Sequence, residues 1–319
     1  MLVRSKSDFQ ALLRTTNDTE LSMFSAQFEQ IQNTILANYF GMEFINALDA
    51  RLNATNPIPA LHADEIFVIG QLKNAIVYLG FDLASARLLA NVKSTGIEQS
   101  GGKSLYEWQQ LIIENDSLEN GYNAINAAIM YLYTKRDNTL FTLWKNSVAE
   151  QNARKYLFNK TADFQECVQI AHSTRTFEAL KPSIKEALIK YIEPITGATL
   201  LAEITTKNID FSIDGTKRVA MNLIKEALAQ FTLGIAIYKL ELKFNEQGAR
   251  VVSISSSSGG KAKTFTPADM ETKDRISERF VSTGNLYLEK LKTYLLDNNL
   301  ITATTYTPID NSKGSCVVL

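Results

Sequence analysis

The chain repeats itself. Five short segments of its first half recur in the second half in the same order, at offsets of 152 to 163 residues. They are SDFQ at 7–10 and ADFQ at 162–165, 31–41 and 187–197, 73–96 and 225–248, SGGK at 100–103 and 258–261, and 121–138 and 284–299. Ordered recurrence at a nearly constant offset indicates a duplicated structural unit. We therefore predict two tandem repeats, residues 1–155 and 156–300, followed by a C-terminal tail, 301–319.

Each repeat is predicted to be mainly α-helical. Ala, Leu, Ile, Lys, Glu and Gln dominate, and apolar residues recur every three or four positions. Pro182 suits the first turn of one helix, and Pro194 is expected to end or kink it. Long helices are predicted over 64–95 and 216–245, each ended by the glycine just beyond it. The residues expected to face the core of the second repeat are Ile184, Ala187, Leu188, Tyr191, Ile192, Val219, Leu223, Ile224, Ala227, Leu228, Phe231 and Ile235.

One β-hairpin is predicted, near 250–266 in the second repeat. Apolar and polar residues alternate around Val251, as they do in a half-buried strand. The run SSSSGG that follows is typical of a turn, and KAKTFT at 261–266 is expected to return as the second strand. The first repeat has only IEQSGGK at this place, so the hairpin is predicted for the second repeat alone.

The end of a phosphate-binding loop, Gly102-Lys103-Ser104, stands before a helix-like run in the first repeat. A complete P-loop has another glycine five positions earlier and follows a strand. Ile97 occupies that glycine position, and the preceding run has the pattern of an amphipathic helix. Ser104 and Glu107 instead fit a capping box at a helix start. We therefore predict no nucleotide cofactor.

The other reactive residues form no catalytic or metal-binding pattern. His62 and His172 lie in different repeats without metal-ligand spacing. Cys167 precedes His172 by five positions, which would put the two on different faces of a helix, and it is predicted to be a core residue. Cys316 opens the ending CVVL, which matches a prenylation box but lacks an upstream basic run, so this tail is expected to pack against a neighbour. We predict a protein that is not an enzyme and holds neither metal nor cofactor.

Composition argues against further classes of protein. The formal net charge is -1, so no global positive field attracts nucleic acid or an anionic membrane. No segment approaches 18 uninterrupted apolar residues, so no membrane span is expected. Two cysteines cannot build a disulfide framework, which fits a reducing compartment.

The repeated unit resembles the head–tail connector, or adaptor, proteins that form neck rings in tailed bacteriophages. In that family a short N-terminal segment leads into a helix ending in glycine, a second long helix, a loop or hairpin, and a last helix. The second repeat follows this order in 163–204, 219–240, 245–253 and 286–299, and the first repeat follows it through 31–48. The chain differs from the usual connector in being long and duplicated, so one chain is expected to take two equivalent positions.

The resemblance implies a structural virion protein whose ring extends the portal vertex and joins capsid to tail. Its implied partners are further copies of the chain, the portal protein, and tail or other neck proteins, while DNA passes through the lumen without sequence-specific contact. The implied location is the virion neck, and the host cytoplasm during assembly. Ring closure needs contacts between unlike faces, for which a hairpin edge and an extended C-terminal arm are suited. The residues expected to contact neighbouring subunits are Val251, Val252, Ile254, Lys261, Lys263, Phe265, Tyr306, Val317, Val318 and Leu319.

Two other functions remain open from the residues alone. A cytoplasmic helical-repeat module that docks a peptide or protein in a groove between the repeats fits the same duplication. A nucleotide-dependent enzyme that uses the loop around Lys103 is the third hypothesis. Oligomeric state with and without Mg-ATP distinguishes the three.

Overall fold

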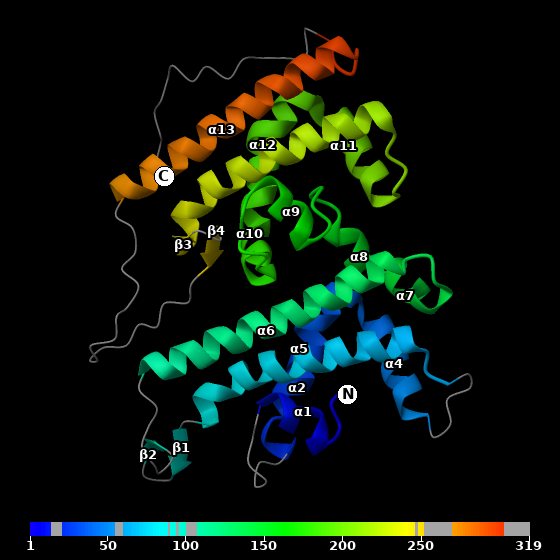
Figure 1. Ribbon diagram of the computed structural model, residues 1–319, viewed down its shortest axis with the longest axis vertical. Coiled ribbons are helices and arrows are strands. Elements are labelled where there is room, and N and C mark those ends of the chain that lie inside the picture. Colours follow the sequence, from blue (N-terminus) through cyan, green and yellow to red (C-terminus); the bar gives the residue numbers. More distant parts are fainter. Residues whose placement is uncertain are drawn as a thin grey trace. The chain divides into compact units, whose positions relative to one another are not determined.

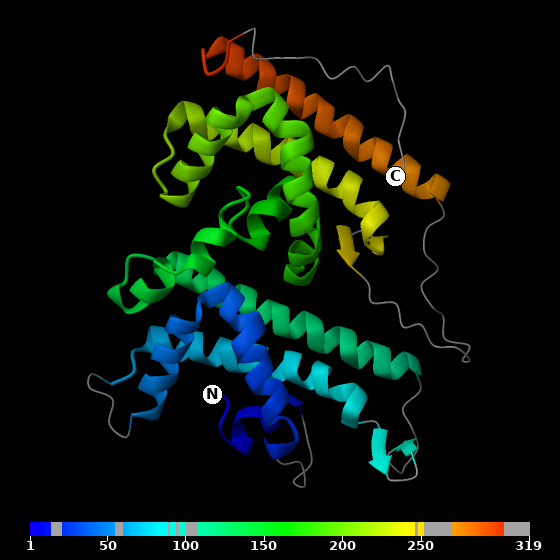
Figure 2. The same ribbon diagram turned by 180° about the vertical axis from the view of Figure 1, so that it is seen from behind.

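The structure of the protein is a computed structural model that describes residues 1–13, 21–54, 60–88, 90–93, 96–99, 107–245, 248–251 and 270–302 (Figure 1, and from behind in Figure 2). Most of the described residues are helical, and the sheets among them are two antiparallel hairpins. The chain divides into two compact units. Unit 1 comprises Met1–Arg154, Phe158–Ala179 and Glu241–Pro267, and unit 2 comprises Lys155–Leu157, Leu180–Leu240 and Ala268–Leu319.

The two sequence repeats contain a similar succession of elements, except that η1 has no counterpart in the second repeat and α11 corresponds to α3 and α4 together. The first repeat runs through α1 (Lys6–Leu13), η1 (Leu21–Met23), α2 (Ser25–Ile31), η2 (Gln32–Leu36), α3 (Ala37–Phe40), α4 (Met42–Asn53), α5 (Ala63–Leu88), β1 (Ala90–Lys93), β2 (Gly96–Gln99) and α6 (Glu107–Thr134). A connecting segment follows, with η3 (Thr139–Phe141), α7 (Thr142–Lys145) and α8 (Val148–Ala153). The second repeat runs through α9 (Thr161–Cys167), α10 (Thr174–Ala187), η4 (Leu188–Ile192), α11 (Glu193–Ile209), α12 (Gly215–Lys239), β3 (Leu242–Asn245), β4 (Gly248–Val251) and α13 (Met270–Asp297).

Irregular backbone recurs at matching positions of the repeats. η2 and η4 are both one-turn π-helices and are 156 residues apart. Five residues beyond each of them a glycine breaks the helix, Gly41 with φ 79° and ψ 136° and Gly197 with φ 72° and ψ 152°. Backbone near these angles is accessible to glycine and strained for other residues. The mainly α-helical fold class and the internal duplication predicted from the sequence are therefore confirmed.

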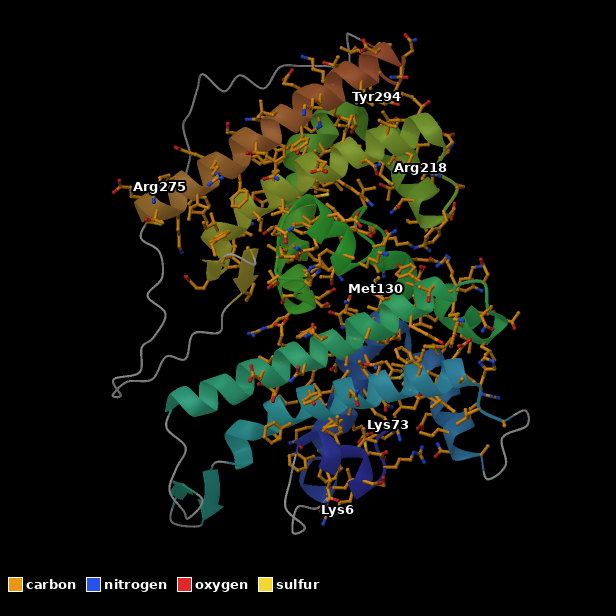
Figure 3. All side chains as sticks on the ribbon, in the orientation of Figure 1. Lys6, Lys73, Met130, Arg218, Arg275 and Tyr294 are labelled. Atoms are coloured by element: carbon orange, nitrogen blue, oxygen red, sulfur yellow. The ribbon has the colours of Figure 1, made fainter. Side chains whose placement is uncertain are left out.

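A tyrosine near the end of the last helix ties it to the start of the long helix in both repeats. In unit 1, α6 packs along α5, and the Tyr131 hydroxyl donates to the Asp64 carboxylate at the start of α5. In unit 2, α13 packs along α12, and the Tyr294 hydroxyl donates to the Thr216 carbonyl oxygen at 3.1 Å. Figure 3 labels Tyr294 on α13. The link is kept although its acceptor changes from a side chain to the backbone.

The hairpin prediction needs two corrections. β1 pairs with β2 in the first repeat, and β3 pairs with β4 in the second with the same register 152 residues later, so a hairpin is present in both repeats. β4 pairs with β3, which precedes it, whereas 261–266, the predicted second strand, lies outside the described residues. β1 and β3 lie within the ranges 64–95 and 216–245, for which the sequence predicts the ends of the long helices. Stretches of four residues are too short to reveal either period, and the antiparallel pairing of the strands decides the outcome.

The helix boundaries differ accordingly from those predicted. α5 ends at Leu88 and α12 at Lys239, and the glycines expected to cap them, Gly96 and Gly248, begin second strands instead. α10 begins well before Pro182, which lies inside it. Pro194 lies in the first turn of α11, and Gly197 rather than this proline makes the kink.

Eight of the twelve core positions predicted for the second repeat are buried, while Tyr191, Leu223 and Ile235 are half-buried and Val219 is exposed. Ile184, Ile224 and Phe231 are buried, and the Tyr191 ring stacks on Phe231 with 4.0 Å between ring centroids. Val219 was predicted to face the core but is 44% exposed. Its counterpart in the first repeat, Phe67, is 39% exposed. The first turns of both long helices therefore present this position to the surface.

The long helix of unit 1 is strongly apolar. By length and composition alone, Ala63–Ala84 of α5 is a candidate membrane span. The core helix of a folded domain has the same composition, and Leu72, Ile76 and Leu79 are buried among the aromatic residues of unit 1. Phe24 and Phe28 stack there with ring centroids 5.6 Å apart.

Candidate functional site

Val251 is the one predicted contact residue that lies in the described part of the chain. It ends β4, and its backbone N–H donates to Thr176 Oγ1 at 3.1 Å. The Ala249 N–H donates to the Gln169 carbonyl oxygen at 3.0 Å. This edge of β4 is thus bound by the chain's own residues within unit 1, which leaves less of it for a neighbouring strand. The remaining predicted contact residues lie outside the described residues: Val252, Ile254, Lys261, Lys263, Phe265, Tyr306, Val317, Val318 and Leu319.

The reactive residues considered in the sequence are placed as follows. Cys167, predicted to be buried, is half-buried at the end of α9, and its thiol donates to the Asp163 carbonyl oxygen at 3.7 Å. His172 is exposed in the turn that follows, and its backbone N–H donates to Gln165 Oε1 at 3.0 Å. Within the described ranges no group of three or more His, Cys, Asp or Glu side chains is placed to hold a metal ion. Lys103 and Ser104 lie outside those ranges.

A polar cluster fixes the start of α5 in unit 1. Asp64 is buried and accepts hydrogen bonds from the Tyr131 hydroxyl and from Asn138 Nδ2, the latter at 3.1 Å. The bond from Tyr131 is the main reason that the pKa of Asp64 lies below its ordinary value. The same bond raises the pKa of Tyr131. The next residue, Glu65, is held by Arg51, whose Nη2 lies 2.8 Å from Glu65 Oε2.

A second buried cluster holds the connecting segment, which is itself part of unit 1, against the chain just beyond α6. Glu150 on α8 is 1% exposed and Arg154 2% exposed, with 2.5 Å between Arg154 Nη2 and Glu150 Oε2. Arg136 Nη1 approaches the other carboxylate oxygen to 2.7 Å. Burial, and after it the charge of Glu150, raises the pKa of the nearby Tyr133. Glu150 and Arg154 have the i, i+4 spacing of a helical ion pair, but Glu150 pairs with Arg136 across 14 positions of sequence, and no local motif identifies that contact.

The connecting segment also covers the glycine break of the first repeat. Ser147 caps α8 by accepting from the Glu150 N–H at 3.1 Å. A Cβ atom placed on Gly41 would lie 3.0 Å from Ser147 Cβ, so the two backbones approach closely. Three residues earlier, Trp144 is buried and contacts the Tyr133 ring edge-on, with 5.2 Å between centroids. The break at Gly41 is therefore filled by the chain that leaves α6.

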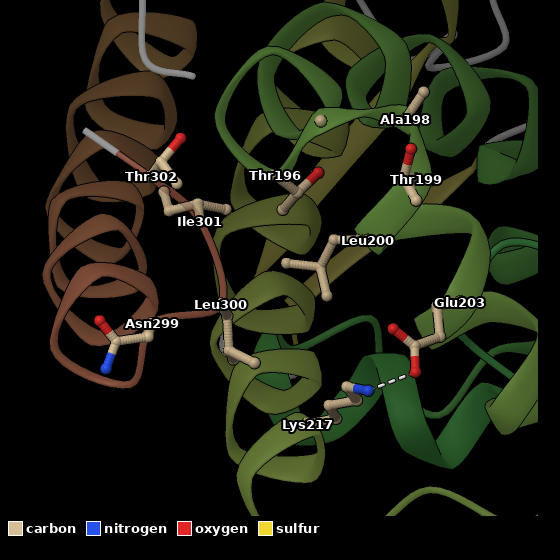
Figure 4. A pocket seen from close by; sticks show the side chains of 11 residues that line it. Thr196, Ala198, Thr199, Leu200, Glu203, Lys217, Asn299, Leu300, Ile301 and Thr302 are labelled. Carbon is tan, nitrogen blue, oxygen red and sulfur yellow. Dashed lines mark hydrogen bonds and ion pairs between the residues drawn. The ribbon is translucent and has the colours of Figure 1, made fainter. Parts of the chain in front are cut away.

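The matching break in the second repeat borders an open pocket of about 430 Å³ in unit 2. Thr196, Thr199 and Leu200 line it on either side of Gly197, and Leu300 and Ile301 face it from the chain beyond α13 (Figure 4). The sequence aligns Gly41 with Gly197, but it does not show what covers each glycine. The sequence alone therefore could not predict a pocket beside Gly197.

The charged residues of the pocket are already paired with one another. Lys217 at the start of α12 donates to Glu203 on α11 (Figure 4). This bond is the main cause that lowers the pKa of Glu203 and raises that of Lys217. Lys207 Nζ also lies 3.5 Å from Glu203 Oε1. Thr196, Leu200 and Ile301 are themselves buried, and the Thr196 hydroxyl donates to the Ile192 carbonyl oxygen at 3.1 Å. The pocket therefore offers mainly Thr199, Asn299, Leu300 and Thr302 to an occupant.

Comparisons with known proteins give one family. Its model matches the chain twice, over residues 36–155 and 173–312, and is described as a family of unknown function, DUF6712. No curated protein and no solved structure matches the chain.

Proposed function

This chain belongs to the DUF6712 family and contains the matched region twice, and we propose that it is a non-enzymatic structural protein of a tailed-phage virion, a head–tail connector that forms a ring at the neck. The proposal places it between the portal protein and the tail or further neck proteins, with DNA passing through the lumen. The resemblance of each repeat to connector proteins motivates it.

The observation that carries the proposal is the repetition of packing details within one chain. The π-helix, the glycine break, the hairpin register and the tyrosine link all recur. Because the chain contains two copies of one structural unit, similar surfaces occur twice on the same chain. A ring needs a contact between unlike faces of successive units, and a duplicated chain brings two such units in a fixed ratio.

Exposed apolar side chains at matching positions suit such contacts. Phe67 on α5 and Val219 on α12 are separated by 152 residues, are apolar in both repeats, and are 39% and 44% exposed. By contrast, Leu286 on α13 is 65% exposed, but its counterpart 163 residues earlier is the polar Asn123. A single exposed apolar side chain is ordinary on a protein surface, but one that is kept at the same place in both repeats is a candidate contact position.

The experiment that tests the proposal is native mass spectrometry of the purified protein, alone and with portal rings, with electron microscopy of any closed assembly. We expect closed oligomers that persist with Mg-ATP, and loss of the assembly in Val219→Glu. Leu286→Glu is the matched control, because it places the same charge on an exposed leucine without an apolar counterpart. A protein that stays monomeric even with portal rings, together with its absence from mature particles, contradicts the proposal.

A second function, a helical-repeat binding module, is favoured by the pocket beside Gly197. In that case the protein remains monomeric and binds a peptide or protein outside the virion. The same mass spectra distinguish the two, because the binding module gives monomers under all the conditions above.

A further inference from the structure

The glycine breaks of the two repeats have the same backbone but different surroundings. At Gly41 the connecting segment supplies Ser147, which lies against the glycine. At Gly197 the equivalent space is the pocket of about 430 Å³. In the first repeat, therefore, the glycine break is covered by the chain that continues past the last helix.

The residues at the end of the last helix and just beyond it are similar in the two repeats. Residues 137–142 read DNTLFT and residues 297–302 read DNNLIT. Phe141 and Ile301 occupy the same place in these sequences, and both are buried. In the first repeat the next residues turn back over the bundle as α7 and α8. In the second repeat Thr302, the last residue of the match, itself lines the pocket.

Seventeen residues, 303–319, follow Thr302 and begin at the rim of the pocket. Ser147 follows Thr142 by five positions, and Tyr306 follows Thr302 by four. Tyr306 is the single aromatic residue of 303–319. An aromatic ring with a hydroxyl suits a site lined by leucine and isoleucine side chains with threonine hydroxyls, because it buries a large apolar area and keeps a polar partner.

We propose that the pocket beside Gly197 is the docking site of the chain's own C-terminal segment, with Tyr306 as the residue that enters it. The segment then covers Gly197 as the connecting segment covers Gly41. Docking within one chain is favoured because the segment starts at the pocket wall, so that only a short loop has to close. The inference gives Tyr306 a place in its own chain instead of the contact with a neighbouring subunit expected from the sequence, and it does not require that a neck ring forms.

Disulfide trapping in the full-length protein tests the docking. In a Cys167→Ser, Cys316→Ser background, which removes both natural cysteines, we would introduce Thr199→Cys on the exposed pocket rim and Thr307→Cys next to Tyr306. We expect a disulfide within single chains that forms at least tenfold more slowly when Tyr306→Ala is added. Asp310→Ala is the matched control in the same segment and should leave the rate unchanged.

Two results would overturn the inference. Equal rates with and without Tyr306 mean that this residue does not hold the segment in the pocket. Disulfides that form only between chains and disappear on dilution mean that a second copy occupies the pocket. Hydrogen exchange gives an independent readout: Tyr306→Ala should speed exchange at least tenfold in 196–203 and leave α5 and α6 unchanged, and unaltered exchange in 196–203 also contradicts the docking.

Discussion

Gly121 on α6 lies so close to Leu79 on α5 that a Cβ atom on the glycine would come within 2.5 Å of Leu79 Cγ. In unit 2 a Cβ on Gly284 of α13 would come within 2.8 Å of Phe231 Cε1 on α12. Leu79 and Phe231 are 152 residues apart, and the glycines are 163 apart. The same close approach of two long helices is thus kept in both repeats, although the side chain that faces the glycine differs.

Substitution of these glycines is expected to destabilise the protein. Gly121→Ala and Gly284→Ala each force the facing side chain to move, which should lower the free energy of unfolding by about 1–3 kcal/mol. Urea unfolding followed by circular dichroism measures this change. Gly70→Ala on α5 is the control, because its Cβ would meet no atom within 4 Å, and it should stabilise by about 0.5–1 kcal/mol. Equal stabilisation by Gly121→Ala would show that the helices do not approach there as described.

The glycine breaks make a separate prediction. Gly197→Ala places a Cβ on backbone with φ 72° and ψ 152°, which is strained by about 1–3 kcal/mol. Gly41→Ala has similar backbone strain and in addition meets Ser147 Cβ at 3.0 Å, so it should destabilise by more than the backbone strain alone. Thermal unfolding of both variants measures the difference. Adding Ser147→Gly should recover part of the loss in Gly41→Ala and none in Gly197→Ala; recovery in both variants would refute a direct contact.

The buried carboxylate of the connecting segment is expected to matter more than any exposed ion pair. Glu150→Ala removes the buried carboxylate that Arg154 and Arg136 share, and breaking a buried ion pair in this way should lower the free energy of unfolding by about 3–5 kcal/mol. Asp137→Ala removes the carboxylate that lies 3.3 Å from Lys145 Nζ and is 98% exposed, so it should change stability by at most about 1 kcal/mol. Urea titrations of both variants give the comparison. Similar small losses would mean that the Glu150 cluster contributes little to attaching α8.

Sequence reasoning succeeded where the signal was local or repeated. The matching of Gly41 with Gly197 and of Tyr131 with Tyr294 rested on segments that recur in the same order at offsets of 156 and 163. Both pairs occupy equivalent places in the structure. It failed at the ends of α5 and α12, because a four-residue strand has too few residues to reveal its period. Within the candidate site, the bond from Val251 to Thr176 spans 75 positions. No local pattern encodes such a bond, so the sequence alone could not show that this edge of β4 is already bound.

A final prediction concerns acid stability through Asp8 at the N-terminus of unit 1. The carboxylate accepts from the backbone N–H groups of Arg4 and Ser5 at 2.9 and 3.0 Å, and Lys73 Nζ on α5 (labelled in Figure 3) approaches it to 2.7 Å. Burial alone would raise the pKa of Asp8, but the hydrogen bond from Lys73 and those from the backbone outweigh it and lower this pKa to about 2. The folded protein thus holds the charged form more strongly than the unfolded chain does.

A lowered carboxyl pKa stabilises the fold above the unfolded-state pKa, and this contribution is lost as the pH falls toward the folded-state pKa. For Asp8 the window runs from the ordinary value of 3.8 down to about 2. Asp8→Asn should therefore reduce the free energy of unfolding by about 1 kcal/mol at pH 7. The difference from wild type should shrink below pH 4 and be mostly lost at pH 2. Thermal unfolding across this range, with Asp137→Asn as the exposed control, measures it, and a difference that stays constant with pH would show that Asp8 acts through its shape and not its charge.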